Sequence, residues 1–139
     1  RRQPRVEEAR AISARRQATA MMDISDALAG DIGHICEASG TGAVIWEHEL
    51  PISSAALNLA SVILTDPKEW ALYGGADYQL LLTAPISAVP ALQEAVRAAG
   101  GGSLTPIGEI LPASEGLCLQ KRSGRVPLEK RSWDHFGRP

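Results

Sequence analysis

The stretch that decides the fold is MMDISDALAGDIGHI, residues 21–35, where an apolar run gives way to a helical pattern. The run ATAMMDI, residues 18–24, is typical of a short β-strand. The pattern after it predicts a helix over 26–38, because apolar residues recur at i, i+4, i+7 and i+8 along one face. These residues are Leu28, Ile32, Ile35 and Cys36. A strand that leads directly into an amphipathic helix indicates a protein that combines strands and helices.

The junction between this strand and this helix carries Asp23, Ser25 and Asp26. If the strand reaches Ile24, Asp23 and Ser25 point to the same side, and Asp26 falls in the first helical turn. One interpretation is that Ser25 or Asp26 caps the helix. The other is that the carboxylates bind Mg²⁺ while free N–H groups at the helix start bind phosphate. The spacing alone leaves both open, whereas His34 is interpreted as a residue of the helix's polar face rather than a ligand.

The rest of the chain alternates helical and extended patterns. Further helices are expected over 6–16, 54–64, 67–72 and 87–99, with Ser53 or Ser54 capping the second and Asp66 before Pro67 starting the third. Strands are expected over 42–51, 77–85, 103–111 and within 117–129, and the apolar run within 77–85 predicts a central position in the sheet. The last of them is typical either of a hairpin or of a strand followed by a turn, with Ser123-Gly124 at the turn. Because the later strands cluster, a mixed sheet with helices mainly on one face fits better than a doubly wound sheet.

The composition is that of one soluble globular domain of 139 residues, with 45% hydrophobic and 22% charged residues. The charge is uneven: residues 1–16 carry six Arg against two Glu, and residues 17–120 carry two basic residues against twelve acidic ones. Solvated faces explain this pattern, and so does an acidic centre that recruits a cation. The terminal position of the basic residues, without interleaved aromatics, argues against a nucleic-acid surface.

Cysteine use and hydropathy indicate a cytoplasmic protein. Cys36 and Cys118 lie far apart, form no metal-ligand spacing, and are expected to be buried free thiols in a reducing compartment. No apolar run approaches the ~18 residues of a membrane span, and no signal-peptide pattern is present. The sequence also lacks GxGxxG and GxxxxGK[ST], the two standard phosphate-binding loops.

Two further motifs have both a structural and a functional interpretation. In YGGADYQLLLT, residues 73–83, the glycine pair allows either a sharp turn or close approach to a ligand. In WDHF, residues 133–136, the aromatic rings either pin the tail to the domain or stack on a flat ligand.

These three motifs, in this order and spacing, together resemble the C-terminal half of the thiamine-monophosphate kinase family. The resemblance covers essentially the whole chain and implies the C-terminal α/β domain of an aminoimidazole-ribonucleotide synthetase-like enzyme. It implies a single domain over 1–139 that lacks the N-terminal ATP-binding domain, which agrees with a sequence that begins with Arg rather than Met. The implied reaction passes the γ-phosphoryl group of ATP to thiamine monophosphate with Mg²⁺, in a homodimeric parent enzyme. This chain alone is expected to be inactive.

The resemblance also implies roles for individual residues, none of them catalytic. Asp23 and Asp26 match Mg²⁺ ligands, and Ser25 matches an ATP contact. Trp133 matches a substrate-contacting position, and Phe136 is its weaker neighbour.

The chain departs from the family pattern at Ala27, at Ala76 and at Gln79, where the family usually reads glutamate. The family usually reads DGL where this chain has Asp26-Ala27-Leu28, and Ala76 stands where the family has a substrate-binding glutamate. The resemblance therefore supports metal and ATP binding more strongly than thiamine recognition. Two alternatives follow: a divergent relative of hydrogenase-maturation or selenophosphate-synthetase proteins, and a non-catalytic binding or assembly module.

Overall fold

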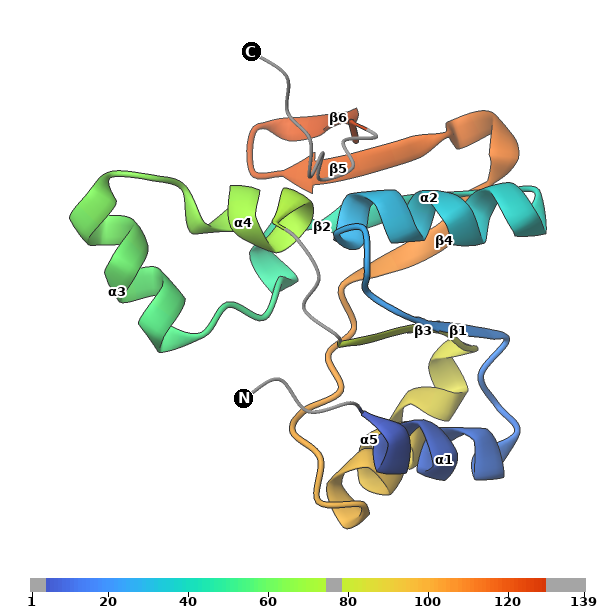
Figure 1. The fold of residues 1–139 in the computed structure, drawn as a ribbon. Helices are drawn as coiled ribbons and strands as arrows, with labels where there is room; N and C mark the ends of the chain where they lie inside the picture. Colours follow the sequence, from blue (N-terminus) through green and yellow to red (C-terminus); the bar gives the residue numbers. More distant parts are fainter. Residues whose placement is uncertain (1–4, 75–78, 130–139) are drawn as a thin grey trace.

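The structure is a computed structural model that describes residues 5–74 and 79–129. Figure 1 shows two layered parts, one built on a four-stranded sheet with α2 against it and one built on two strands with α1 and α5 beneath them. The expected Ala76, Trp133 and Phe136 contacts lie outside the described residues.

The larger sheet has the strand order β4-β2-β5-β6, with β2 at Thr41–Trp46, β4 at Gly108–Pro112, β5 at Leu117–Lys121 and β6 at Gly124–Pro127. β2 runs parallel to β5, and the other neighbouring pairs are antiparallel. This mixed sheet confirms the predicted fold class. The predicted hairpin is also present: Lys121 pairs with Gly124, so the turn itself is Arg122-Ser123.

The two remaining strands, β1 (Ala20–Asp23) and β3 (Leu80–Thr83), form a separate antiparallel ribbon. The predicted central position of β3 is therefore wrong, since among the described residues β3 pairs with β1 alone. The apolar run has a different cause. Leu81 packs into the core beneath α2, while Leu80 and Leu82 pack against a second core, so both faces of the ribbon are covered.

Two hydrophobic cores hold these layers together. α2 (Leu28–Ser39) supplies Leu28, Ile32, Ile35 and Cys36 to the first core, as the periodicity predicts. α1 (Val6–Arg15) and α5 (Val89–Ala98) pack on each other and supply the second core from the other face of the ribbon. Cys36 is buried as expected, but Cys118, on β5, is only partly buried, and its thiol donates to the carbonyl of Glu115 at 3.2 Å.

α3 (Ser54–Ile63) and α4 (Pro67–Tyr73) extend from one side of the domain (Figure 1). Their predicted caps are confirmed: Ser53 Oγ accepts from the N–H of Ala56 at 3.2 Å, and Asp66 Oδ1 accepts from that of Lys68 at 2.9 Å. Only Ala60 of α3 is buried, so this helix leaves most of its apolar side chains exposed.

Short 3₁₀ turns join several elements: η1 at Glu47–Glu49, η2 at Ile86–Ala88 and η3 at Ala113–Glu115. η1 ends β2 at Trp46, so the strand predicted over 42–51 is shorter than expected. Within the described ranges, none of the helices has both the length and the apolar character to cross a bilayer.

Candidate functional site

The loop between β1 and α2 carries the three polar residues of the opening motif. Asp23 is the last residue of β1, and Ser25 and Asp26 follow in the loop, all three exposed to solvent. The helix begins at Leu28, two residues later than predicted, because Ala27 has φ 81° and ψ 155°, which no helix allows. Asp26 therefore lies before the first helical turn rather than in it.

Neither Ser25 nor Asp26 caps α2, so the capping interpretation is wrong. The N-cap position is Ala27, and no side chain there accepts a hydrogen bond. Instead Asp31, in the first turn, reaches back to the loop. Its Oδ2 accepts the backbone N–H of Ser25 at 2.8 Å and that of Asp26 at 3.1 Å.

These two hydrogen bonds involve the loop before α2, whereas the expectation of free N–H groups for phosphate concerns the first turn of α2, which begins at Leu28, and stays a prediction. The N–H groups of Ser25 and Asp26 are already used by Asp31. The sequence does indicate that Asp31 has hydrogen-bond partners, because Asp31 is three residues after Leu28 and four before Ile35. It thus occupies the apolar stripe, where a carboxylate is buried only if it has partners.

Asp31 also belongs to a group of possible metal ligands. Asp26, Asp31 and His34 each offer one ligand atom, and these atoms lie within 4.8 Å of one another. His34 Nε2 is 3.6 Å from Asp26 Oδ2, and both side chains are more than half exposed, whereas Asp31 is fully buried. Asp23 is not a member of this group. Two carboxylates and an imidazole are donors that divalent cations accept, so the residues fit a metal.

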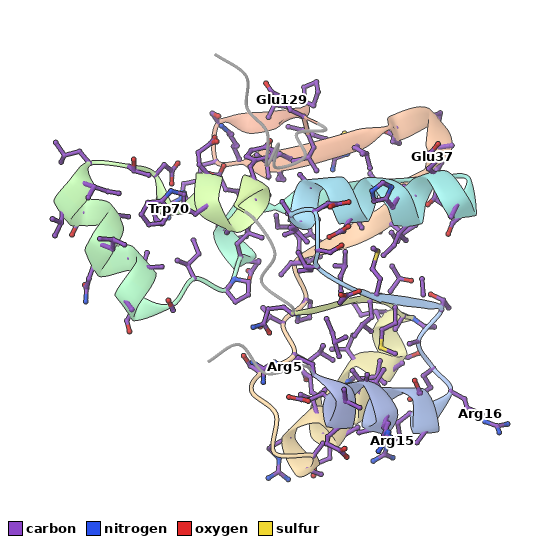
Figure 2. The ribbon with its side chains drawn as sticks, viewed as in Figure 1. Arg5, Arg15, Arg16, Glu37, Trp70 and Glu129 are labelled. Carbon is purple, nitrogen blue, oxygen red and sulfur yellow. The ribbon has the colours of Figure 1, made fainter. Side chains whose placement is uncertain are left out.

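A cavity of about 890 Å³ lies between the two layered parts. Leu28, Trp70, Gly74 and Gln79 are among the residues that line it. Gly74 and Gln79 flank the segment that contains Ala76, which is itself outside the described residues. Trp70 extends from α4 on the side that faces α3 (Figure 2).

The family model described as AIR synthase related protein, C-terminal domain, matches residues 1–117. The chain belongs to this family. It is 37% identical over 136 residues to thiamine-monophosphate kinase of Escherichia coli O157:H7, a match that spans 98% of this chain. It is 36% identical over 132 residues to the enzyme of Halobacterium salinarum. The chain spans only about 40% of the length of these relatives.

Solved structures of this family have the same fold. Thiamine monophosphate kinase from Aquifex aeolicus has a TM-score of 0.69 and 31% identity over 89% of this chain. A structure described as AaThiL complexed with AMPPCP and TMP has a TM-score of 0.73 and 32% identity over 95% of this chain. E. coli HypE, a hydrogenase maturation protein, reaches a TM-score of 0.73 at 19% identity, which shows a shared fold alone.

Proposed function

We propose that this chain is the C-terminal domain of an ATP-dependent, Mg²⁺-requiring thiamine-monophosphate kinase. The observation that carries the proposal is 37% identity to such a kinase across 98% of the chain, which includes the loop between β1 and α2. An AMPPCP and TMP complex of a relative with the same fold supports ATP and thiamine monophosphate as the ligands.

In this proposal Asp23 and Asp26 hold Mg²⁺, and Ser25 contacts ATP. All three are exposed in one loop, so their oxygen atoms are accessible to a ligand. The bound cation would supply charge neutralisation of the crowded phosphates during phosphoryl transfer. The protein's own contribution is position: Asp31 holds the N–H groups of Ser25 and Asp26, which fixes the loop that carries both side chains.

The domain supplies half of a site. Because the chain spans about 40% of its relatives, we infer that an N-terminal ATP-binding domain faces this loop in a cytoplasmic, homodimeric parent enzyme. Trp133, Phe136 and the position of Ala76 would contact thiamine monophosphate. The isolated domain is then inactive, because the nucleotide platform is missing.

The kinase assay of the full-length parent tests this proposal. ATP-dependent, Mg²⁺-dependent conversion of thiamine monophosphate to thiamine diphosphate is the expected result. ATP binding without turnover would instead favour a non-catalytic binding module. The presence of Ala76 in place of the family's glutamate supports that alternative. In the parent, Asp23→Asn and Asp26→Asn should lower kcat/KM far more than the melting temperature.

Glu37→Gln is the matched control for these carboxylate substitutions. Glu37 is exposed at the opposite end of α2 from the loop (Figure 2). Its substitution should leave both kcat/KM and melting temperature close to wild type. Equal losses of melting temperature and activity in Asp23→Asn and Asp26→Asn would count against ligand roles for them.

A further inference from the structure

The group formed by Asp26, Asp31 and His34 contains a histidine that the resemblance does not assign to any role. Asp31 and His34 are three residues apart on α2, so they lie on the same side of the helix. Asp26 approaches them from the preceding loop, with its Oδ2 3.6 Å from His34 Nε2. All three ligand atoms lie within 4.8 Å of one another.

Asp31 has one carboxylate oxygen that the protein leaves without a partner. Its side chain is 0% exposed, and Oδ2 takes both backbone N–H groups. Oδ1 is buried and has no hydrogen-bond partner among residues 5–74 and 79–129. In the same ranges, neither Asp26 nor Asp31 forms an ion pair with a Lys or Arg. A buried carboxylate oxygen without a donor is costly, and a cation beside it removes that cost.

The spacing of the three atoms suits a single ion. Donor atoms about 2.1 Å from an octahedral ion lie about 3 Å apart when adjacent and about 4.2 Å apart when opposite. The three ligand atoms lie within 4.8 Å of one another, and small side-chain rotations would bring them to these distances. Asp26 and His34 are free to make them, since their side chains are 58% and 60% exposed.

The donor set also selects the class of ion. Mg²⁺ and Ca²⁺ prefer oxygen donors alone, whereas an imidazole nitrogen favours first-row transition ions, and among these Mn²⁺ also suits the two carboxylates. We propose that Asp26, Asp31 and His34 bind a divalent transition-metal ion, with Mn²⁺ as its representative, and that water completes the coordination. This inference extends the metal role proposed for Asp26 and names two further ligands. It does not depend on ATP or on kinase activity.

Mn²⁺ titration of the 139-residue chain, with free Mn²⁺ followed by electron paramagnetic resonance, tests the proposal without nucleotide. One Mn²⁺ should bind per chain. His34→Ala should weaken binding by about tenfold or more, since even loss of an outer-shell partner has effects of that size. Mg²⁺ affinity, measured by competition in the same experiment, should change much less. His48→Ala is the matched control, because His48 is also exposed beside a carboxylate, Glu49, at 3.4 Å.

Asp31→Asn tests the buried ligand. The asparagine oxygen still accepts the N–H groups of Ser25 and Asp26, so the variant retains an acceptor for the loop while losing the negative charge. Circular dichroism and the melting temperature establish that it is folded, and it should bind Mn²⁺ more weakly than wild type. The proposal is overturned if the wild-type chain binds no Mn²⁺, if His34→Ala matches His48→Ala, or if folded Asp31→Asn binds like wild type. Each of these results leaves the kinase proposal standing, because that proposal is tested by turnover in the parent.

Discussion

The backbone N–H of Ser25 donates a 2.8 Å hydrogen bond to Oδ2 of Asp31, six residues later and inside the helix. Asp31 is buried in the first turn of α2 and fixes the loop from there. No side chain at the N-cap position accepts a hydrogen bond from the start of α2. The conformation of the loop that carries the exposed side chains of Ser25 and Asp26 therefore depends on the buried carboxylate of Asp31.

Asp31→Ala should destabilise the domain by about 2–3 kcal/mol, because it removes a charged acceptor from two N–H groups. Asp31→Asn keeps an acceptor and should cost about 1 kcal/mol. Urea unfolding of both variants measures the difference. If Asp31→Ala unfolds at the wild-type urea concentration, the two hydrogen bonds do not stabilise the loop.

Ala27→Gly should be nearly neutral, although Ala27 is fully buried. Its φ of 81° and ψ of 155° lie in a region that only glycine adopts easily, and relief of that strain is worth about 1–3 kcal/mol. Loss of the buried methyl group costs about 0.8 kcal/mol, and the freer unfolded chain costs a further 0.4–1 kcal/mol or so. These opposing effects largely cancel in the free energy of unfolding.

Ala29→Gly is the control for Ala27→Gly. Ala29 is equally buried but lies inside α2 in ordinary helical conformation. Its replacement has no strain to relieve and should cost about 1.5–2 kcal/mol, from helix propensity and lost burial. Equal destabilisation by the two substitutions in urea would show that Ala27 is not strained.

Glu8 should make the stability of the domain depend on pH in the acidic range. A hydrogen bond from its own backbone N–H lowers the pKa of the Glu8 carboxyl, partial burial opposes this, and the Arg5 guanidinium at 3.0 Å lowers it further. Because the folded pKa is below the unfolded one, the contribution is complete above the unfolded pKa of about 4.3 and is lost as pH falls through the folded pKa.

Glu8→Gln removes this contribution. The difference in melting temperature between wild type and Glu8→Gln should be largest near neutral pH and should shrink below pH 4. Glu7→Gln is the control, since Glu7 is well exposed and its pairing with Arg10 is longer, at 3.4 Å. A difference that stays constant between pH 3 and 7 would exclude the ionised carboxylate as its source.

Solubility should rise when α3 loses its exposed apolar side chains. Val62 is 77% exposed and Leu59 is 54% exposed, and both lie on a helix that buries only Ala60. Exposed apolar patches of this kind promote aggregation, so Leu59→Lys with Val62→Lys should raise the ammonium sulfate concentration needed for precipitation. Ile86→Lys replaces a comparably exposed residue on η2, outside α3, and should have a smaller effect. A larger effect of Ile86→Lys would show that α3 is not the limiting surface.

Much of the fold was predictable because its signals are local. The stripe of α2 and the caps at Ser53 and Asp66 each depend on residues within one or two turns, and all are confirmed. The position of β3 was not predictable in the same way. A continuous apolar run shows that both faces of a strand are covered, but it does not show whether strands or helices cover them.

The site was predicted less completely than the fold. The loop with Asp23, Ser25 and Asp26 was recognised, yet the start of α2 was placed two residues early. The helix predicted over 26–38 includes Ala27, which instead adopts a positive φ of 81°. Asp31 was missed although its place in the apolar stripe of α2 indicates a buried, partnered carboxylate; its partners could not be named, because they are backbone groups.

The ribbon of β1 and β3 has a practical meaning for protein engineering. Asp23 pairs with Leu80, and the N–H of Ile24 donates to the carbonyl of Gln79 at 2.8 Å, so the loop before α2 leaves from the same end at which β3 enters. The two segments are more than fifty residues apart in the sequence, but they are hydrogen-bonded neighbours. A graft of the DISD loop into a new scaffold must therefore include both strands. A graft of the loop with α2 alone would lose the partner that sets the loop's point of departure.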